Sequence, residues 1–436
     1  MTQPQTTTAP QAEAAAQADL PGYCCRLADQ ARRAGRRLAT MTDQQRSAAL
    51  RHIAEALERQ APAIIEANAK DLETGRQMDL SSAMLDRLRL DEKRIAQMAE
   101  SVRQIAQQTD PVGRVVEGYT RPNGLRLERV RVPIGVILFI YESRPNVTSD
   151  AAALCIKSGN AIILRGGREA IHSNTLLTQT IREGLEKAGI EPDAVQLVQT
   201  TDRAAVGELL KLEGRIDLVI PRGGEGLIRA VVEQSRIPVI KHYAGNCHLY
   251  IDARCDEQMA LDVTVNAKTQ RPGVCNAIET LLVHREHARG GLLARLCEAL
   301  GERGVELRGD EAVRKVWAKA RPAAEADWDT EFLDLVLAVR VVGSLDEAIE
   351  HINAHGSGHT DGIITSDLAS AERFTGEVDA SGVFINCSTR FADGGEYGLG
   401  AEIGISTDKL HARGPMGATD LTTYKWIVRG DGQVRQ

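Results

Sequence analysis

The stretch PIGVILFIYESRPNVTSDAAALCIKSGNAIILR, residues 133–165, decides the fold class of this chain. It contains two short apolar runs, VILFIY and AIILR, separated by a stretch of different pattern. Short apolar runs that alternate with amphipathic stretches are typical of βαβ units, whose parallel strands are buried between helices. The runs VQLV, IDLVI and PVI continue the pattern up to residue 240. We therefore predict a parallel sheet in an α/β domain from residue 133 onward.

A second set of apolar runs begins near Cys247 and again alternates with helical segments: HLYID, IETLLVH, VLAVRVV, DGIITSD and GVFIN. This set predicts a second α/β domain in tandem with the first.

The residues before 133 show two other patterns. From about Tyr23 to Gln108 the chain is rich in Ala, Arg and Gln, and Thr42 with Gln45 matches a capping box, so we predict helices there. Residues 113–132 contain two extended runs on either side of the pair Asn123-Gly124, which predicts a long β-hairpin.

Composition narrows the classes of function. At about 100 to 200 residues per domain, the 436 residues predict two or three compact units. A formal charge of −7 gives no electrostatic reason to expect nucleic acid, so we expect small-molecule ligands. The eight cysteines are scattered, which favours a reducing, cytoplasmic setting. No apolar run approaches the roughly 20 residues that cross a bilayer, and residues 1–20 suit a disordered tail better than a signal peptide.

Two glycine-rich loops each follow a predicted strand and precede a predicted helix, where backbone amides and the helix dipole favour an anion. The first loop contains Arg165, Gly166, Gly167 and Arg168, and the second contains Arg222, Gly223, Gly224 and Gly226. Neither matches GxGxxG, and glycine is also required in turns for steric reasons alone. The two loops together make a nucleotide site and plain turns equally good interpretations.

Cys275 stands between a Pro-Gly turn and the start of an apolar run, in TQRPGVCNAIET, residues 269–280. Loops that a rigid strand holds in place are where catalytic groups concentrate, so Cys275 is a candidate nucleophile. Most of the other cysteines fall at apolar positions, where cysteine acts as a small hydrophobic residue. Cys247, His248 and His242 lack any standard zinc spacing, and we expect no metal site.

Several long motifs occur in an order that resembles one known family. They are PIGVILFIYESRPN, SGNAIILRGG, RPGVCNAIETLLVH, GSGHTDGIIT and FINCSTRFADGGEYGLGAEIGIST. Over residues 20–430 the chain is similar to the γ-glutamyl phosphate reductases of the aldehyde dehydrogenase superfamily. The resemblance implies NADPH-dependent reduction of L-glutamate 5-phosphate to glutamate 5-semialdehyde with release of phosphate, the second step of proline biosynthesis. It also makes glutamate 5-kinase, which forms this substrate, a candidate partner.

The resemblance further implies an aldehyde dehydrogenase-like fold made of a Rossmann-like cofactor domain, an α/β catalytic domain and a β-hairpin that joins subunits into a homo-oligomer. On this basis residues 21–113 and 133–246 are expected to bind NADPH, and residues 247–420 to carry the nucleophile. Residues 114–132 and 421–436 are then the oligomerisation hairpin, and residues 1–20 the tail.

The catalytic residues that the resemblance implies are Cys275, as the nucleophile, and Asn146, whose amide would bind the oxyanion beside the backbone N–H of Cys275. Asn146 could equally be an ordinary turn residue. Glu331 is expected to hold the nicotinamide ribose, with an exposed structural acid as the alternative. Ser388, Thr389 and Arg390 are the first choice for binding substrate. Weaker candidates are Arg144, Lys268, Arg271 and Arg413 for the anionic groups, and Glu396 or Glu402 for the ammonium.

Two departures from related superfamily members refine the expected reaction. Members that hydrolyse the thioester carry a glutamate in a LELGG-type segment, whereas this chain reads IKHYAGN, with His242 near that place. We therefore expect no base that activates water, and His242 is either a packing residue or a catalytic one. Members that prefer NAD carry an acid where this chain has Arg168, and an arginine there suits the 2′-phosphate of NADPH.

Two other functions remain open at the level of sequence. One is that of a coenzyme A-acylating aldehyde dehydrogenase, which also works without deacylation by water. The other is a catalytically inactive nucleotide-binding or scaffolding protein, against which the presence of Cys275 and both glycine loops argues.

Overall fold

The structure, a computed structural model, describes residues 19–435. Residues 1–18 of the predicted tail, residues 1–20, lie outside the described residues. Helix α2 begins at Leu20, within the range predicted as tail. The chain divides into two compact units between Lys241 and His242. Residues 398–404 and the chain from residue 416 return to the first unit, whereas residues 405–415 belong to the second.

The first unit is built on a four-stranded parallel sheet with the order β5-β4-β3-β6, which confirms the predicted βαβ pattern. The quoted stretch 133–165 forms its centre, because all six residues of β3 and all five of β4 are buried. The four strands are β3 (Val136–Tyr141), β4 (Ala161–Arg165), β5 (Val195–Leu197) and β6 (Leu218–Arg222).

The prediction of a strand at PVI, residues 238–240, was wrong. This segment meets β6 only at a bridge between Val219 and Val239. Pro238 has no N–H to donate to a ladder, so the pairing does not extend.

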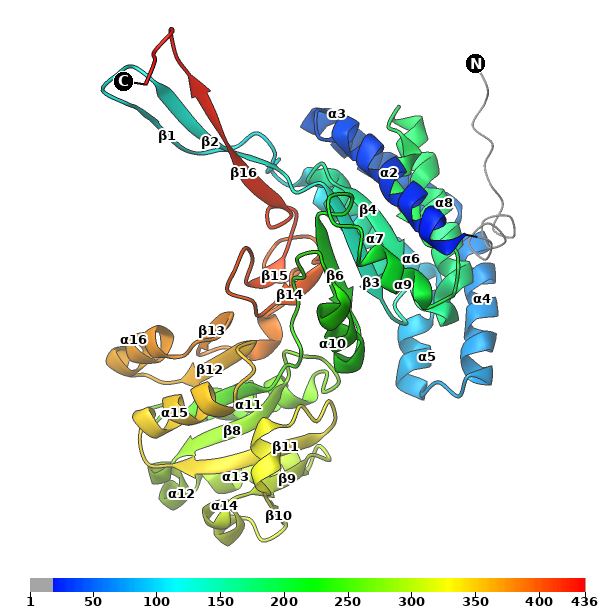
Figure 1. The fold of residues 1–436 in the computed structure, drawn as a ribbon. Helices are drawn as coiled ribbons and strands as arrows, with labels where there is room; N and C mark the ends of the chain where they lie inside the picture. The colour runs from blue at the N-terminus through cyan, green and yellow to red at the C-terminus, as the bar shows by residue number, and fades with distance from the viewer. Residues whose placement is uncertain (1–18, 436) are drawn as a thin grey trace. The chain divides into compact units, whose positions relative to one another are not determined.

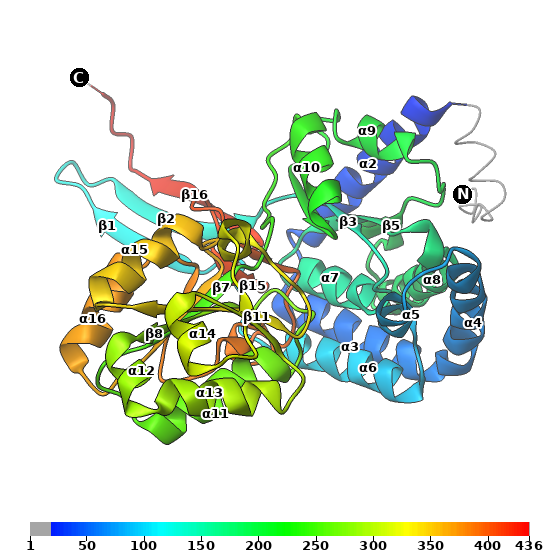
Figure 2. The ribbon, with the colours of Figure 1, turned by 90° about the horizontal axis from the view of Figure 1, so that it is seen from below.

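Helices cover both faces of this sheet (Figures 1 and 2). One face packs against α2, α9 and α10 in a core that includes Leu27, Leu138 and Val231. The other carries α7 and α8, with α3 and α6 packed against them. The predicted capping box is confirmed at the start of α3, where Thr42 and Gln45 each accept the other's backbone N–H. The helices are α2 (Leu20–Leu38), α3 (Asp43–Arg59), α4 (Ala61–Gln77), α5 (Ser82–Leu88), α6 (Glu92–Gln107), α7 (Asn146–Lys157), α8 (Ile171–Lys187), α9 (Ala204–Leu209) and α10 (Glu225–Gln234).

The predicted hairpin is confirmed as the strands β1 (Val115–Thr120) and β2 (Arg126–Pro133), which turn at Gly124 with a φ of 89°. A third strand from the end of the chain, β16 (Thr422–Arg429), lies antiparallel beside β2 (Figure 1). Within residues 19–435 no further strand pairs with β1 or β16, so this sheet has two open edges. Its exposed large apolar side chains are Val115, Val116, Tyr119, Tyr424, Trp426 and Val428.

The second unit contains a seven-stranded parallel sheet with the order β10-β9-β11-β8-β7-β12-β13. All five predicted strands are confirmed, while β9 and β10 were missed because ELRG and RP are short and polar. The seven strands are β7 (Cys247–Ile251), β8 (Ile278–His284), β9 (Glu306–Gly309), β10 (Arg321–Pro322), β11 (Val336–Val342), β12 (Thr360–Ile364) and β13 (Gly382–Ile385).

Helices again lie on both faces, with α11 (Glu257–Thr269) and α13 (Leu292–Gly301) on one and α15 (Leu345–His355) and α16 (Leu368–Glu377) on the other (Figure 2). The remaining elements are α12 (Arg285–Gly290), α14 (Glu311–Val316), a two-stranded sheet of β14 (Gly404–Ser406) and β15 (Gly414–Met416), and the 3₁₀ turns η1 (Arg168–Ala170), η2 (Pro192–Ala194), η3 (Glu325–Asp329) and η4 (Thr389–Phe391).

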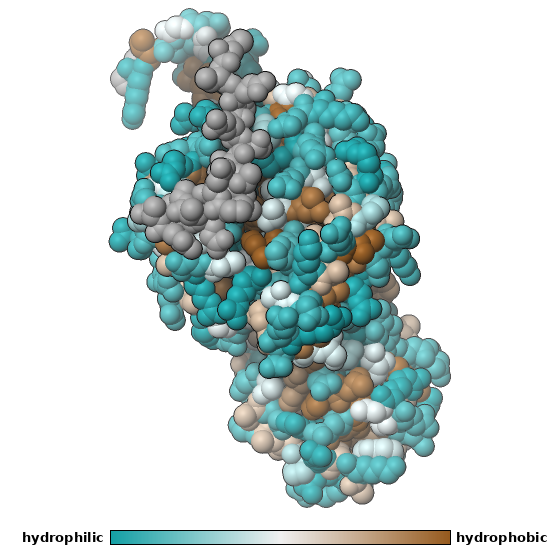
Figure 3. All heavy atoms as spheres, turned by 90° about the vertical axis from the view of Figure 1, so that its right-hand side faces the viewer, coloured by the Kyte–Doolittle hydropathy of each residue, from teal (hydrophilic) through white to brown (hydrophobic). Residues whose placement is uncertain are grey.

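The face drawn in Figure 3 is largely hydrophilic, and its apolar side chains form small separate groups. None of the helices in residues 19–435 is long and apolar enough to cross a bilayer.

Candidate active site

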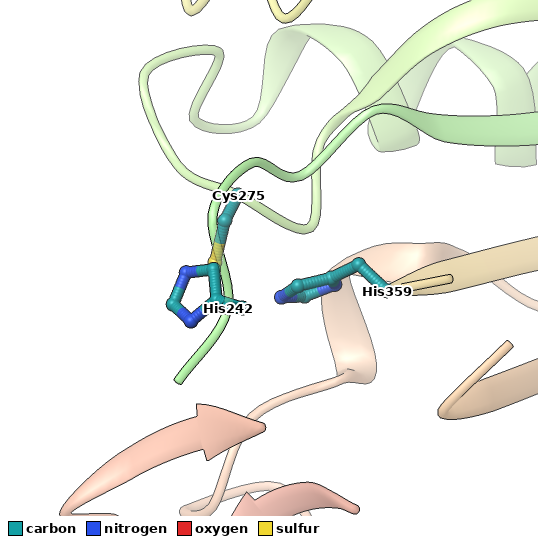
Figure 4. Close-up of side chains that lie close together, drawn as sticks. All are labelled: His242, Cys275 and His359. Atoms are coloured by element: carbon teal, nitrogen blue, oxygen red, sulfur yellow. The ribbon is translucent and has the colours of Figure 1, made fainter. Parts of the chain in front are cut away.

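Cys275 lies where three neighbouring strands of the second unit begin. β8, β7 and β12 are adjacent and parallel, so the loops that precede them meet at one edge of the sheet. Cys275 precedes β8, Gly245 precedes β7, and His359 precedes β12. Figure 4 shows the thiol of Cys275 and the rings of His242 and His359 pointing toward one another. Their potential ligand atoms all lie within 4.8 Å of each other.

The backbone of Cys275 is held from behind by the loop before β7. A Cβ atom added to Gly245 would lie 2.6 Å from the Cα of Cys275 and closer still to its carbonyl oxygen. The Cys247 thiol donates a hydrogen bond to the same oxygen at 3.1 Å, and burial raises the pKa of that thiol well above its usual range. Cys247 therefore stays protonated and serves as a donor, not as a second nucleophile.

Glu331 fixes Gly245 in turn, because its carboxylate accepts the Gly245 N–H at 2.9 Å. The residue expected to contact the nicotinamide ribose is thus also linked, through one glycine, to the backbone of Cys275.

The segment predicted to bind substrate lies beside the nucleophile loop. The Thr389 hydroxyl donates to the carbonyl oxygen of Asn276 at 2.7 Å, and the Asn276 amide donates to the carbonyl oxygen of Ala392 at 3.0 Å. Ser388 accepts the backbone N–H of Arg390 at 3.3 Å. The hydroxyl groups of Ser388 and Thr389 therefore shape the segment, and Arg390 is the member of the trio that brings charge to it.

Arg390 and Arg271 form a cationic pair near Cys275. Burial, and next the neighbouring Arg271 guanidinium, lower the pKa of Arg390, while Asp393, Cys275 and Cys247 act in the opposite direction. The Arg390 Nε also donates to Gln270 at 2.9 Å, which orients the guanidinium. Two cations held this close favour an anion between them, and an arginine fork suits phosphate.

Lys268 is not available to the substrate. Its ammonium lies 2.5 Å from Glu279, and both side chains are fully buried. Burial raises the pKa of Glu279 to about 7 and lowers the pKa of Lys268. The attraction between the two charges acts in the opposite direction on both pKa values. Glu279 also accepts the Leu333 N–H at 3.1 Å, so the pair ties α11 and β8 to the loop after Glu331.

The two histidines beside Cys275 have fixed surroundings. The Nδ1 of His242 lies 2.9 Å from the carbonyl oxygen of Ile405, which only accepts, so this nitrogen carries the proton. In the neutral ring the lone pair then lies on Nε2. His359 is fully buried, with its Nδ1 2.9 Å from the Thr360 hydroxyl. His248, considered with Cys247 and His242 in the sequence, instead lies against Asp361 at 3.3 Å.

In the first glycine-rich loop, one side-chain nitrogen of Arg165 forms no hydrogen bond with residues 19–435. Arg165 ends β4 and donates from its terminal nitrogens to Gly166 and Thr201, whereas its buried Nε has no partner among residues 19–435. Side chains at Gly166 and Gly167 would collide with Asn174 and Glu169 respectively. Arg168 follows at the surface.

The second glycine-rich loop immediately precedes helix α10. The Gly224 N–H donates to Glu142 at 3.1 Å, and Arg222 pairs with Glu402 at 3.0 Å. A Cβ added at Gly224 or Gly226 would meet no atom within 4 Å, and no side chain caps this ten-residue helix. The exposed glycines Gly223, Gly224 and Gly226 at a helix start, together with the spare Nε of Arg165 and the exposed Arg168, suit the phosphates of a dinucleotide.

Asn146 begins α7 in the first unit, and its side chain bonds to Asp150 one turn later. Burial raises the pKa of Asp150 to about 6, and hydrogen bonds from Ser101 and Asn146 partly offset this effect. Asp150 therefore orients the amide that was predicted to bind the oxyanion.

Sequence reasoning missed Gly245, His359 and Glu279. Of these, only Glu279 carried a local signal, because an acid inside the buried run IETLLVH needs a partner. Gly245 and His359 lie 30 and 84 residues from Cys275 in sequence and are brought to it by strand order.

Comparison with known proteins agrees with this architecture. A γ-glutamyl phosphate reductase of Geotalea daltonii is 55% identical over 94% of this chain and 98% of its own length. One from Rhodopirellula baltica is 52% identical over 99% of both chains. The crystal structure of a γ-glutamyl phosphate reductase from Thermotoga maritima is 45% identical, covers 95% of this chain and 100% of its own, and superposes with a TM-score of 0.92.

The sequence model of the aldehyde dehydrogenase family matches residues 5–313 and 323–405, which is most of the chain. With the parallel sheets of both units and a cysteine at the meeting point of three strand starts, this match establishes that the chain belongs to the aldehyde dehydrogenase family.

Proposed function

We propose that this chain reduces γ-glutamyl phosphate to glutamate 5-semialdehyde, with release of phosphate, through a thioester on Cys275 and with NADPH as reductant. The overall activity is the one named in relatives that are 52–55% identical over nearly the whole chain, and it is the second step of proline biosynthesis. The observation that carries the mechanism is a half-buried thiol, fixed at the meeting of three strand starts, with Arg271 and Arg390 close by.

The first half-reaction transfers the acyl group to sulfur. The Cys275 thiolate attacks the acyl carbon, a C–S bond forms, and the bond to phosphate oxygen breaks so that phosphate leaves with the electron pair. The backbone N–H of Cys275 and the amide of Asn146 stabilise the oxyanion of the tetrahedral intermediate. Arg271 and Arg390 bind the phosphate before and after it leaves.

The second half-reaction reduces the thioester. Members of this family work with a nicotinamide cofactor, and NADPH supplies a hydride to the thioester carbonyl when it is bound. The phosphates of the cofactor would be held by the two glycine-rich loops, through Arg165, Gly166, Gly167, Arg168, Gly223 and Gly224. Glu331 would hold its nicotinamide ribose. The resulting thiohemiacetal on Cys275 then collapses to the aldehyde and the free thiol.

The reverse reaction provides the sharpest test of this mechanism. Glutamate 5-semialdehyde and NADP⁺ should yield about one equivalent of NADPH per active site and then stop, because the acyl-enzyme accumulates until an acceptor arrives. Inorganic phosphate or arsenate should restart turnover, since the segment that carries the water-activating glutamate in hydrolytic relatives reads IKHYAGN here, with His242 near that place. Absorbance of NADPH in a stopped-flow instrument measures both phases.

Three outcomes separate the candidate activities. Release by phosphate supports the proposal, whereas release by coenzyme A alone would assign the chain to the coenzyme A-acylating enzymes. Steady NADPH formation without any acceptor, with free glutamate as product, would mean that water is activated after all.

Cofactor choice depends on Arg168. We expect NADPH to be preferred over NADH by at least about tenfold in kcat/KM, which corresponds to about 1.4 kcal/mol. Arg168→Glu should abolish this preference, because a carboxylate repels the 2′-phosphate and can bond the ribose hydroxyls. Arg51→Glu, an exposed arginine in α3, is the matched control for the change in charge. Equal kcat/KM for the two cofactors in the unmodified enzyme would contradict the assignment.

The wider organisation is also part of the proposal. We assign residues 21–113 and 133–246 to NADPH binding, residues 247–420 to catalysis, and residues 114–132 with 421–436 to subunit contact. The exposed apolar residues and two open edges of the β1-β2-β16 sheet support a homo-oligomeric interface there. All eight cysteines are free, which supports a reducing cytoplasmic location. Glutamate 5-kinase remains the proposed protein partner.

A further inference from the structure

The cluster of Cys275, His242 and His359 has the composition of a transition-metal site. One potential ligand atom from each residue lies within 4.8 Å of the other two, and the two imidazole rings are 5.4 Å apart between centroids at 69°. Zinc bonds of about 2.0–2.3 Å in a tetrahedron place the ligand atoms roughly 3.3–3.8 Å apart. Small rotations of the three side chains close that difference.

The chemistry of the three donors selects the ion. A thiolate with two imidazoles suits Zn²⁺, whereas Mg²⁺ and Ca²⁺ prefer oxygen ligands. The guanidinium groups of Arg271 and Arg390 near Cys275 oppose any divalent cation. Binding therefore depends on coordination bonds to sulfur and nitrogen and not on the local charge. The site is thus selective for Zn²⁺ over ions that prefer oxygen ligands, such as Mg²⁺ and Ca²⁺.

Both histidines have a polar contact at Nδ1, and that of His242 is of the kind that metal-binding histidines use. Such residues usually donate their second ring N–H to a carbonyl, a carboxylate or water, which fixes the tautomer and the ring orientation. His242 does this through Nδ1 and the carbonyl oxygen of Ile405, at 2.9 Å. The Nδ1 of His359 lies 2.9 Å from the Thr360 hydroxyl.

We propose that Cys275, His242 and His359 form an inhibitory Zn²⁺ site that blocks the enzyme reversibly. On binding, the Cys275 thiol releases its proton to solvent, an S–Zn bond forms, and the two neutral imidazoles and one water complete the coordination shell. No oxidant or reductant takes part. The ion removes the nucleophile, and this inhibitory consequence rests on the role of Cys275 in the proposed function, whereas the binding itself does not.

Binding is tested on the purified full chain without substrate. Isothermal titration with Zn²⁺ should give one ion per chain, and Co²⁺ should produce the thiolate-to-metal charge-transfer absorption of a cysteine ligand. Cys275→Ser should abolish that absorption. His242→Gln and His359→Gln should each weaken Zn²⁺ binding by at least about tenfold. His242 is only half-buried, so its variant keeps the test usable if the buried His359→Gln does not fold.

A second Cys-His contact supplies the matched control. Cys255 and His287 lie 3.5 Å apart, and among residues 19–435 they belong to no group of three potential ligands, so Cys255→Ser should leave Zn²⁺ binding unchanged. Turnover should fall with added Zn²⁺, recover with a chelator, and be unaffected by Mg²⁺. Zn²⁺ affinity that survives in Cys275→Ser or in both histidine variants would overturn the site. Zn²⁺ bound to Cys275 without loss of turnover would instead contradict the role of Cys275 as nucleophile.

Discussion

Replacement of Cys275 by serine should lower turnover by several orders of magnitude and leave the affinity for NADPH nearly unchanged. A serine hydroxyl has a much higher pKa than a thiol and needs an adjacent base to attack an acyl phosphate. The serine also fits the same backbone position, because Gly245 and Cys247 hold residue 275 through its main chain. Steady-state kinetics gives kcat/KM, and fluorescence titration gives the cofactor affinity.

Cys255→Ser is the control for this experiment, since Cys255 is also a half-buried thiol of the second unit but pairs with His287. Its kinetics should match those of the unmodified enzyme. If Cys275→Ser retained near-normal turnover, Cys275 would have no place in the mechanism. If NADPH affinity fell in parallel with turnover, the substitution would have disturbed the fold and not the chemistry alone.

The second large effect is expected from Gly245→Ala, a change of one methyl group outside the reacting atoms. Its Cβ would lie 2.6 Å from the Cα of Cys275, which no folded structure tolerates, so one of the two loops must move. A displacement of about 1 Å at the nucleophile can cost roughly 100-fold in rate, and overpacking of this kind costs about 1–3 kcal/mol of unfolding free energy. Both quantities can be measured, by kcat and by denaturant unfolding.

Gly376→Ala separates this effect from the general cost of replacing a glycine. Gly376 lies in α16, and a Cβ added there would meet no atom within 4 Å. That variant should keep full activity and gain up to about 1 kcal/mol of stability, because alanine is the better helix residue. Wild-type activity in Gly245→Ala would show that the loop before β7 does not hold the nucleophile.

The fold could be predicted where the signal was local. The run that became β3 is apolar at every position, as a strand covered on both faces requires, and the pair Asn123-Gly124 marked the hairpin turn. The prediction failed at residues 238–240, because Pro238 has no N–H to donate to a strand ladder. It also failed at β9 and β10, which are too short to show a pattern of apolar residues. The length and the apolar content of each strand, and not the way the strands pair, decided which strands could be predicted from the sequence.

The site was predictable only in part, for a related reason. Cys275 had a local signal in the Pro-Gly turn before a buried run, and Arg390 had one in its place after a strand. His359 had no such signal, because its position beside Cys275 follows from the order β8-β7-β12, which places strands far apart in sequence next to each other. Gly245 is needed because of another chain segment that touches it, and local sequence does not encode that contact.

The return of the chain end to the first unit has a consequence for synthesis on the ribosome. Residues 242–397, which make up most of the second unit, are synthesised before residues 398–404 and the chain from residue 416, which the first unit still lacks. β16 pairs with β2 along its whole length, and the Leu421 carbonyl accepts a hydrogen bond from Asn160 at 2.8 Å. Until Thr422–Arg429 emerge, β2 therefore presents an unpaired edge that other nascent chains can join.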